Sequence, residues 1–400
     1  MADVSTRVSR PGTVDEPVPV VLAGARGHGR WHLANLRRLA DQGRVRLVGV
    51  CELSPLDPAE LAGFDEVRQG TELGPLLERT GARVAIVCTP IHTHLPLALA
   101  AAERGVHLLL EKPPTPSFAA YQRLLDGLAR SGTLCQIGFQ SLGSHAVPAI
   151  RALVADGAVG RVRGIAAAGA WARDEAYFTR AAWAGRRRLD GRDVVDGVLT
   201  NPLAHAVATA LRIAGADRAE DVATVETELW RANDIEADDT SALRVRTTRG
   251  GVVTAGVTLC AEQPGEPYVV VHGDRGHLTF WYKQDRVRLV RDGREVQVTE
   301  YPRTDLLTDL LDRLAQGEAH PGLLVPPERT GAFMRVVEAV RTAPAPRRLP
   351  DGAWRHEPGE RAPRRVVTGV DALVAASART LSLFSELGTP WRDVDGEDPR

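Results

Sequence analysis

Short apolar runs alternate with helical patterns over about the first 140 residues of this 400-residue chain. The predicted strands are 18–23, 45–51, 84–88, 106–110 and 134–139, and the predicted helices between them are 31–40, 72–80, 95–104 and 117–131. Strands that read as continuous apolar runs are typical of a parallel sheet, because helices cover both of its faces. The pattern therefore predicts an α/β domain built on a parallel, doubly wound sheet.

The second part of the chain has a different pattern. The predicted strands here are 162–171, 222–231, 241–247, 252–259, 268–272, 277–281 and 287–290, and the predicted helices are 145–156, 198–214, 305–315, 328–341 and 371–387. Most of these strands follow one another without a helix between them. Such a succession predicts an α+β domain with a large, mostly antiparallel sheet.

The bulk composition excludes several classes of protein. A formal net charge of −1 gives no basic surface for nucleic acid or an anionic membrane. No apolar run approaches the ~20 residues that a membrane-spanning helix needs. The four cysteines are widely spaced and form no C-x-x-C pair, which predicts free thiols in a reducing cytoplasm.

Lys112 is the most informative single residue. The chain has 50 Lys and Arg residues, yet only Lys112 and Lys283 are lysines. A desolvated lysine can lose its proton near neutral pH, whereas an arginine cannot. Lys112 also follows an apolar run that predicts a buried strand, and ligands bind at the carboxyl ends of such strands in open α/β sheets. A surface lysine beside a turn is the competing interpretation.

The first strand-to-helix turn is rich in glycine. It reads Gly24-Ala25-Arg26-Gly27-His28-Gly29, with Arg26 where G-x-G-x-x-G has its second glycine. Such a turn lets backbone N–H groups approach a pyrophosphate. Glu52 ends the second strand, where a carboxylate accepts from ribose hydroxyls and repels a 2′-phosphate. The glycine turn and Glu52 together favour NAD over NADP, although Arg26 or Arg30 could hold a phosphate. A plain structural turn is the alternative.

Two further motifs carry polar side chains. The third strand ends in Cys88-Thr89-Pro90-Ile91-His92-Thr93-His94, which predicts a polar loop over a cofactor; without an accompanying ligand cluster, its histidines do not predict a metal site. Asn201 and His205 are four residues apart in the predicted helix 198–214, so they would share one face. The alternative is that Asn201 caps the helix before Pro202 and that His205 is a satisfied buried histidine.

Taken together, Glu111-Lys112-Pro113, the Thr89-Pro90 loop with His94, and the glycine turn ending at His32 resemble the glucose-fructose oxidoreductase, inositol dehydrogenase and rhizopine catabolism (Gfo/Idh/MocA) family. The resemblance runs from about residue 18 to the C-terminal helix. It implies a Rossmann domain, an α+β domain with an open sheet that commonly forms the oligomer interface, and often a cis Lys-Pro peptide. In the family, a lysine and a D-x-x-x-H pair surround the reacting carbon. This chain departs from the pattern with Asn201, Asp196 and Arg26.

The resemblance assigns most of the chain. We expect a disordered leader at 1–17, a dinucleotide-binding domain at 18–140, and a substrate-binding and oligomerisation domain at 141–400 with an exposed Pro- and Arg-rich excursion at 343–365. The expected cofactor-binding residues are Gly24, Arg26, Gly27, His28, Gly29, Glu52, Thr89, Pro90, His94 and Glu111. The softer substrate-side candidates are Gln140, Trp171, Arg173, Trp183 and Asp196, since aromatic faces with arginine suit a sugar or a sugar acid.

The expected activity is hydride transfer between NAD and a secondary alcohol or ketone of a sugar, cyclitol or sugar derivative. His205 would be the base, because its ordinary pKa lies near neutral pH. Lys112 would stabilise the alkoxide, and Asn201 would orient the substrate. As a base, Lys112 would need its pKa lowered by about 3 units, or roughly 4 kcal/mol.

Two alternative functions stay open. One is transient sugar oxidation by a tightly bound NAD, leading to elimination or glycoside cleavage, and the other is a non-catalytic NAD- or sugar-sensing protein. The expected partners are a sugar or polyol and further copies of the chain, as a dimer or tetramer, with no metal, nucleic acid or membrane.

Overall fold

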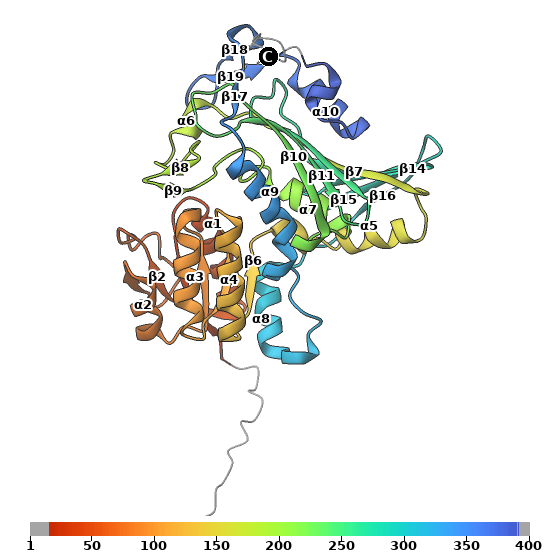
Figure 1. Ribbon diagram of the computed structural model, residues 1–400. Helices are drawn as coiled ribbons and strands as arrows, with labels where there is room; N and C mark the ends of the chain where they lie inside the picture. The colour runs from red at the N-terminus through yellow and green to blue at the C-terminus, as the bar shows by residue number, and fades with distance from the viewer. Residues whose placement is uncertain (1–15, 390, 392–400) are drawn as a thin grey trace, which may run out of the picture.

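The computed structural model describes residues 16–389 and 391 and shows two lobes (Figure 1). The expected leader, 1–17, lies outside the described residues except for its last two. The first lobe is built on a six-stranded sheet with the order β3-β2-β1-β4-β5-β6, in which every pairing is parallel. Its strands are β1 (Val18–Ala23), β2 (Val45–Cys51), β3 (Arg68–Gly70), β4 (Val84–Val87), β5 (His107–Leu110) and β6 (Cys135–Ile137). The predicted parallel α/β domain is confirmed; the short strand β3 was not predicted.

Helices cover the faces of this sheet. They are α1 (Gly29–Asp41), α2 (Leu73–Thr80), α3 (His94–Ala102) and α4 (Phe118–Ser131). The central strands β1 and β4 are almost wholly buried, which explains why they read as continuous apolar runs. The strand ends followed by the glycine turn, Thr89 and Lys112 therefore meet at one edge of the sheet.

The second lobe is built on a nine-stranded sheet with the order β16-β15-β14-β13-β7-β12-β11-β10-β17. Its strands are β7 (Val162–Ala170), β10 (Val222–Arg231), β11 (Thr240–Thr247), β12 (Val252–Thr258), β13 (Tyr268–Gly273), β14 (Gly276–Trp281), β15 (Arg286–Arg291), β16 (Arg294–Glu300) and β17 (Arg347–Arg348). Only β7–β12 and β10–β17 pair in parallel. The predicted, mostly antiparallel sheet is confirmed, and β16 and β17 extend it at its two edges.

Helices lie on both faces of the second sheet. They include α5 (Ala146–Ala155), α7 (Ala204–Ile213), α9 (Gly331–Thr342) and α10 (Val370–Thr380). Alternate residues of β7 separate two cores: Ile165 and Ala167 belong to the main core with α7, whereas Ala166 and Ala168 belong to a smaller core with α10. This alternation is the ordinary consequence of the two-residue period of a strand.

The prediction of a helix at 198–214 is wrong in its first part. Helix α7 begins at Ala204, and residues 198–203 form successive turns. Asp238 explains the difference, since Val198 N donates to its carbonyl (2.9 Å) and Leu199 N to its carboxylate (3.5 Å). Asn201 therefore does not share a helix with His205, and Leu203, not Asn201, is the N-cap of α7.

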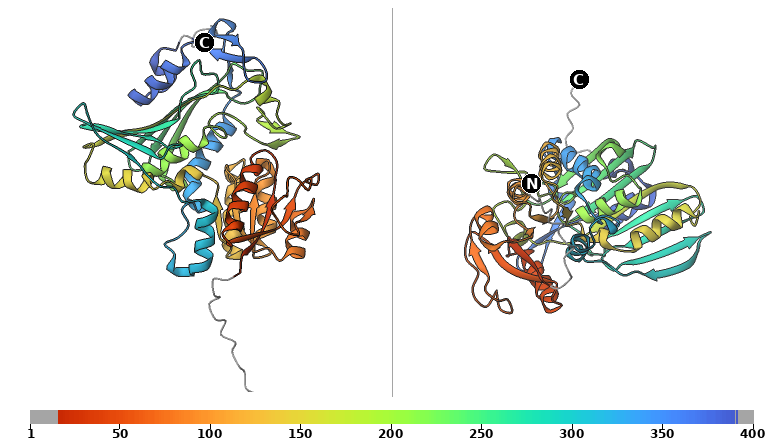
Figure 2. Two further views of the ribbon diagram at one scale, coloured as in Figure 1. Left: turned by 180° about the vertical axis from the view of Figure 1, so that it is seen from behind. Right: turned by 90° about the horizontal axis from the view of Figure 1, so that it is seen from below.

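A later segment returns to the first lobe. Helix α8 (Leu306–Gln316) packs against β6 and β5, and Figures 1 and 2 show it beside the first sheet. The buried Gln136 of β6 donates to Asp309 (2.6 Å) and accepts from Val325 N (2.8 Å). Contacts from α1 add to this, because Asn35 donates to Asp305 (3.1 Å). The two lobes are therefore joined by more than the connection after β6.

The remaining elements are short. They are β8 (Arg188–Leu189), β9 (Arg192–Asp193), α6 (Glu175–Phe178), β18 (Trp354–Glu357) and β19 (Arg364–Val367), with 3-10 turns at 91–93, 140–143, 219–221, 317–319, 327–330, 351–353 and 384–387. The segment 343–365 lies largely at the surface, but Leu349 and Arg365 are buried within it. None of the described helices has the length and apolar character needed to cross a bilayer.

Candidate functional site

The glycine turn after β1 has a backbone that requires glycine at two positions. Gly24 has φ +83°, and a Cβ there would lie 2.3 Å from the carbonyl oxygen of Cys88. A Cβ on Gly29 would lie 2.0 Å from the carbonyl oxygen of Gly24. Gly27 has φ +59° with open space around it. The turn thus keeps its backbone exposed in front of α1, as a phosphate cradle at a helix N-terminus does.

Glu52 faces this turn from the end of β2. Its Oε1 accepts hydrogen bonds from Ala25 N (2.6 Å) and Arg26 N (3.2 Å). The guanidinium of Arg26 lies 3.7 Å from the other carboxylate oxygen and donates to the carbonyls of Ser54 and Pro55. The carboxylate predicted to accept from the ribose is therefore next to the turn, and it pairs with Arg26, one of the two arginines that could favour a 2′-phosphate.

Glu111 is the centre of a buried hydrogen-bond cluster at the end of β5. Its Oε1 lies 2.9 Å from His32 Nε2, 2.9 Å from Gln140 Nε2 and 3.6 Å from His28 Nε2. Burial alone would raise the pKa of Glu111, but hydrogen bonds from His28 and His32 outweigh it and hold this pKa well below the usual range. The cluster fixes the residue before Lys112 against the glycine turn.

The ligand atoms of His28, His32 and Glu111 lie within 4.8 Å of one another, so they have the spacing of a three-residue metal site. Glu111 Oε1 already accepts from His32 and Gln140, and Oε2 accepts from Lys112 N (3.2 Å). We therefore assign these side chains to hydrogen bonding with one another. The absence of a metal stays a prediction.

His94 anchors the Thr89-Pro90 loop. The ring is buried, with Nε2 2.8 Å from the carbonyl of Thr89 and Nδ1 2.9 Å from the carbonyl of Pro113. Burial lowers the pKa of His94. The side chain thus links the loop after β4 to the cis peptide between Lys112 and Pro113. Thr89 Oγ1 and Thr93 Oγ1 are 2.6 Å apart on the same loop.

Lys112 reaches across to the second lobe. Its Nζ donates to Asn201 Oδ1 (2.6 Å) and to the carbonyl of Asn201 (3.0 Å). Asn201 Nδ2 in turn donates to Asp196 Oδ1 (2.5 Å). Desolvation lowers the pKa of Lys112, against the opposing effect of Glu111 and Asp196. The structure therefore brings together Lys112, Asn201 and Asp196, although Asn201 lies outside a helix.

Asp196 itself is buried and well held. Its Oδ2 accepts from Gly185 N (2.8 Å) and Arg180 Nη2 (3.3 Å). The residue before it, Val195, has φ +45°, an unusual conformation for a β-branched residue and one that clusters at functional sites. The position of Asn201 is therefore fixed by a backbone that is itself constrained.

His205 is the second residue of α7. Its Nδ1 lies 3.3 Å from Ser141 Oγ, which accepts a hydrogen bond from Thr209 Oγ1 (2.9 Å), and its ring packs edge-on against Phe139. Desolvation by burial, followed by the charge of Lys112, lowers the pKa of His205 to about 3. The imidazole is therefore neutral throughout the physiological range.

The aromatic candidates lie on one loop. The guanidinium of Arg173 is 4.9 Å from the ring centroid of Trp171, and that of Arg180 is 4.6 Å from the ring centroid of Trp183.

Sequence reasoning missed Arg180, Ser141, Thr209 and Asp238. No sequence pattern could have identified these residues, because each contacts a site residue that is distant in the sequence or lies in a loop without regular periodicity.

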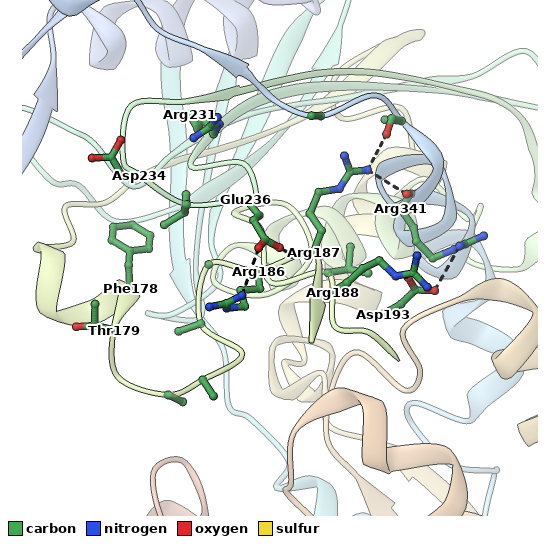
Figure 3. Close-up of a pocket in the computed structure, with 18 residues that line it drawn as sticks. Phe178, Thr179, Arg186, Arg187, Arg188, Asp193, Arg231, Asp234, Glu236 and Arg341 are labelled. Carbon is green, nitrogen blue, oxygen red and sulfur yellow. Dashed lines mark hydrogen bonds and ion pairs between the residues drawn. The ribbon is translucent and has the colours of Figure 1, made fainter. Parts of the chain in front are cut away.

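A cavity of about 1010 Å³ is lined in part by residues of the loop that carries the aromatic candidates, among them Phe178 and Thr179 (Figure 3). Its charged side chains are largely paired with one another, as in Arg186 with Glu236 and Arg341 with Asp193. Gly185, which donates to Asp196, and Val195, the residue before Asp196, line it, but Lys112, Asn201 and His205 do not. The cavity is adjacent to the candidate catalytic cluster and is not its location.

Two family models match the chain. An oxidoreductase family with an NAD-binding Rossmann fold matches residues 18–139, and the GFO/IDH/MocA C-terminal domain matches residues 147–279. This chain belongs to the Gfo/Idh/MocA family. The expected family and the expected Rossmann domain with its α+β partner are confirmed.

Individual relatives are more distant. The inositol 2-dehydrogenase of Streptomyces avermitilis is 30% identical over 149 residues, covering 36% of this chain and 41% of that protein. The 4-carboxy-2-hydroxymuconate-6-semialdehyde dehydrogenase of Sphingobium sp. is 28% identical over 120 residues, covering 30% of this chain and 37% of that protein. This chain spans about two fifths of the length of the curated relatives it matches.

Solved structures resemble the whole fold. The WlbA dehydrogenase of Bordetella pertussis, in complex with NADH and UDP-GlcNAcA, aligns with a TM-score of 0.66 at 20% identity over 81% of this chain and 95% of that chain. A levoglucosan dehydrogenase in complex with NADH aligns with a TM-score of 0.66 at 18% identity over 81% of this chain and 96% of that chain. At these identities, the likeness shows the fold.

Proposed function

We propose that this protein is an NAD-dependent oxidoreductase that transfers hydride between the nicotinamide and a secondary alcohol or ketone of a sugar, cyclitol or sugar derivative. The observation that carries the proposal is the Lys112–Asn201–Asp196 chain, because it places a lysine of lowered pKa between the cofactor lobe and the second lobe. Neutral His205 belongs to the same cluster.

The first lobe fits a dinucleotide. Gly24, Gly27 and Gly29 keep the turn backbone open for a pyrophosphate, and the position of Glu52 beside this turn supports a role in accepting from ribose hydroxyls. Glu52 also engages Arg26, which favours NAD over NADP. When bound, NAD supplies the hydride acceptor, or NADH the donor.

Lys112 is the better candidate for exchanging the substrate proton. The low pKa of His205 makes its imidazolium costly, so His205 is proposed to hydrogen-bond the substrate oxygen as a neutral ring. Burial moves the pKa of Lys112 downwards, towards the range in which an amine exchanges protons. Asn201 orients the Lys112 amine through its own anchor on Asp196. This division of roles differs from the histidine base expected from ordinary pKa values.

The substrate class follows from the relatives and from the loop. The matched curated proteins include inositol 2-dehydrogenases and a levoglucosan dehydrogenase, and Trp171 and Trp183 lie with Arg173 and Arg180 in a loop whose aromatic and cationic side chains suit a sugar or a sugar acid. The test is to incubate the protein with NAD⁺ and a panel of hexoses and cyclitols, and to follow nicotinamide absorbance. We expect turnover with at least one of them and its loss in Lys112→Met. Turnover that is unchanged in Lys112→Met would contradict the proposal.

The same assay separates the alternative of a retained cofactor. Denaturing the purified protein would release NAD, and product analysis would show a sugar altered without net NADH. A protein that binds NAD and sugar but alters neither would indicate the sensing alternative.

The proposal extends to assembly and location. Val296 and Val298 of the edge strand β16 are 58% and 50% exposed, which supports a homodimer or tetramer formed through the second sheet. All four cysteines are free, which supports a reducing cytoplasm. Light scattering of the purified protein measures the assembly.

A further inference from the structure

Cations and aromatic rings alternate across the loop that follows β7. The guanidinium of Arg173 lies 4.9 Å from the ring centroid of Trp171 and 5.2 Å from that of Tyr177. The guanidinium of Arg180 lies 3.8 Å from the ring centroid of Tyr177 and 4.6 Å from that of Trp183. Lys283 Nζ lies 5.6 Å from the ring centroid of Trp171. We call Lys283, Trp171, Arg173, Tyr177, Arg180 and Trp183 the aromatic ladder.

One end of the aromatic ladder attaches to the candidate catalytic cluster. Arg180 donates to Asp196, which accepts a hydrogen bond from Asn201. The ring of Tyr177 lies between Arg180 and Arg173, with its centroid 3.8 Å from the Arg180 guanidinium and 5.2 Å from that of Arg173. Arg173 therefore connects to the proposed reacting centre through Tyr177, Arg180 and Asp196.

The charge of Arg173 is not neutralised. Arg180 pairs with Asp196 and Lys283 pairs with Glu266 (3.1 Å), but in the described part of the chain no carboxylate oxygen lies within 4.0 Å of Arg173. Its neighbour Asp174 is occupied at the N-terminus of α6, accepting from Tyr177 N (3.1 Å) and Arg361 N (2.8 Å). The Arg173 side chain donates to the carbonyl of Ala172 (2.9 Å) and also hydrogen-bonds the side chain of Tyr177, so its hydrogen-bond partners are neutral.

Arg173 is also half-buried and fixed in direction. Two rings hold its planar guanidinium, so little conformational freedom is left to lose when it binds a ligand. A guanidinium in such a position presents paired N–H donors to a carboxylate or phosphate, the planar arrangement that makes bidentate bonds strong.

We propose that Arg173 binds an anionic group of the substrate, which makes the substrate an acidic sugar, either a sugar carboxylate or a sugar phosphate. This inference rests on the proposed function. It narrows the substrate class within the sugars and cyclitols, and it assigns Arg173 to specificity and not to hydride transfer.

The test compares each neutral hexose or cyclitol with its uronic acid and its monophosphate, using NAD⁺ and the wild-type protein. We expect kcat/KM for one acidic form to exceed that of the neutral form by at least about 10-fold, as a charged hydrogen bond does. The uronic acid and the phosphate arms identify which anion is read. In Arg173→Met, this preference should disappear, mainly through KM.

Arg161→Met is the matched control. Arg161 is exposed and precedes β7, whereas Arg173 follows its other end. The control should keep the preference for the acid, and Arg173→Lys should restore part of it. Thermal shift by the acidic sugar in the presence of NADH gives a readout that does not depend on turnover.

The outcomes distinguish a failure of the proposed Arg173 role from a failure of the proposed oxidoreductase function. Neutral sugars that are turned over as well as their acids, with an unchanged Arg173→Met profile, would overturn the role of Arg173 and leave the oxidoreductase intact. A protein that binds no dinucleotide would instead overturn the proposed function. If sugars are not turned over, an acid-specific thermal shift that is lost in Arg173→Met supports the role of Arg173, and the absence of that shift overturns it.

Discussion

At the scale of single residues, the cluster around Lys112 depends on which groups carry charge. Asp196 is the carboxylate of this cluster on the second lobe. The neutral amide of Asn201 donates to Asp196 and accepts from Lys112, so it connects the two charged groups. Desolvation lowers the pKa of both Lys112 and His205, but only His205 falls to about 3. The proton exchange in alcohol oxidation is therefore assigned to Lys112.

This assignment predicts a pH dependence. Because protonated Lys112 cannot accept a proton, kcat/KM for alcohol oxidation should rise with pH through one ionisation that lies below the ordinary lysine pKa of 10.5. His205→Gln should slow the reaction but keep this ionisation. Lys112→Arg should remove it and reduce kcat/KM by at least about 100-fold. An ionisation that persists in Lys112→Arg, or vanishes in His205→Gln, would contradict the assignment.

At the scale of elements, the sequence predicts strands and helices well where apolar periodicity is strong. The parallel strands other than β3, and helices α1 to α4, follow from continuous buried runs and the patterns between them. The start of α7 could not be predicted, because its preceding turn bonds to Asp238, some forty residues later. For the same reason, the predicted helix shared by Asn201 and His205 is wrong in its first part.

Asp238 makes the stability of the fold around this turn depend on pH. Burial raises the pKa of its carboxyl to about 6, against an ordinary value of 3.8. Between these values, the folded protein binds more protons than the unfolded chain, so the stability from this group is full below pH 3.8 and is lost as pH rises through 6. Asp238→Asn removes the titration.

Relative to wild type, Asp238→Asn should therefore gain up to about 3 kcal/mol in unfolding free energy between pH 4 and pH 7. Urea denaturation of both proteins at each pH measures this difference. A difference that is independent of pH would show that the carboxyl of Asp238 titrates normally.

At the scale of the whole molecule, the two lobes are joined by the return of α8 to the first sheet. Gln136→Leu should remove the hydrogen bonds to Asp309 and Val325 N from a buried site, at a cost of about 2–3 kcal/mol in unfolding free energy. Chemical denaturation followed by circular dichroism measures it. Gln297→Leu, on the exposed edge strand β16, should be nearly neutral. Equal stability of Gln136→Leu and wild type would mean that this junction contributes little.

Binding of NAD by the first lobe can be tested by thermal unfolding with NAD⁺, NADH, NADP⁺ and NADPH. At about 100 times its dissociation constant, a ligand of the folded state adds about 2.7 kcal/mol. We predict such a shift with NAD(H) for wild type. In Glu52→Gln, which loses the carboxylate beside Arg26, the NAD(H) shift should weaken and the NADP(H) shift should grow. A wild-type protein that shifts with none of the four, and releases no dinucleotide on denaturation, would contradict the account.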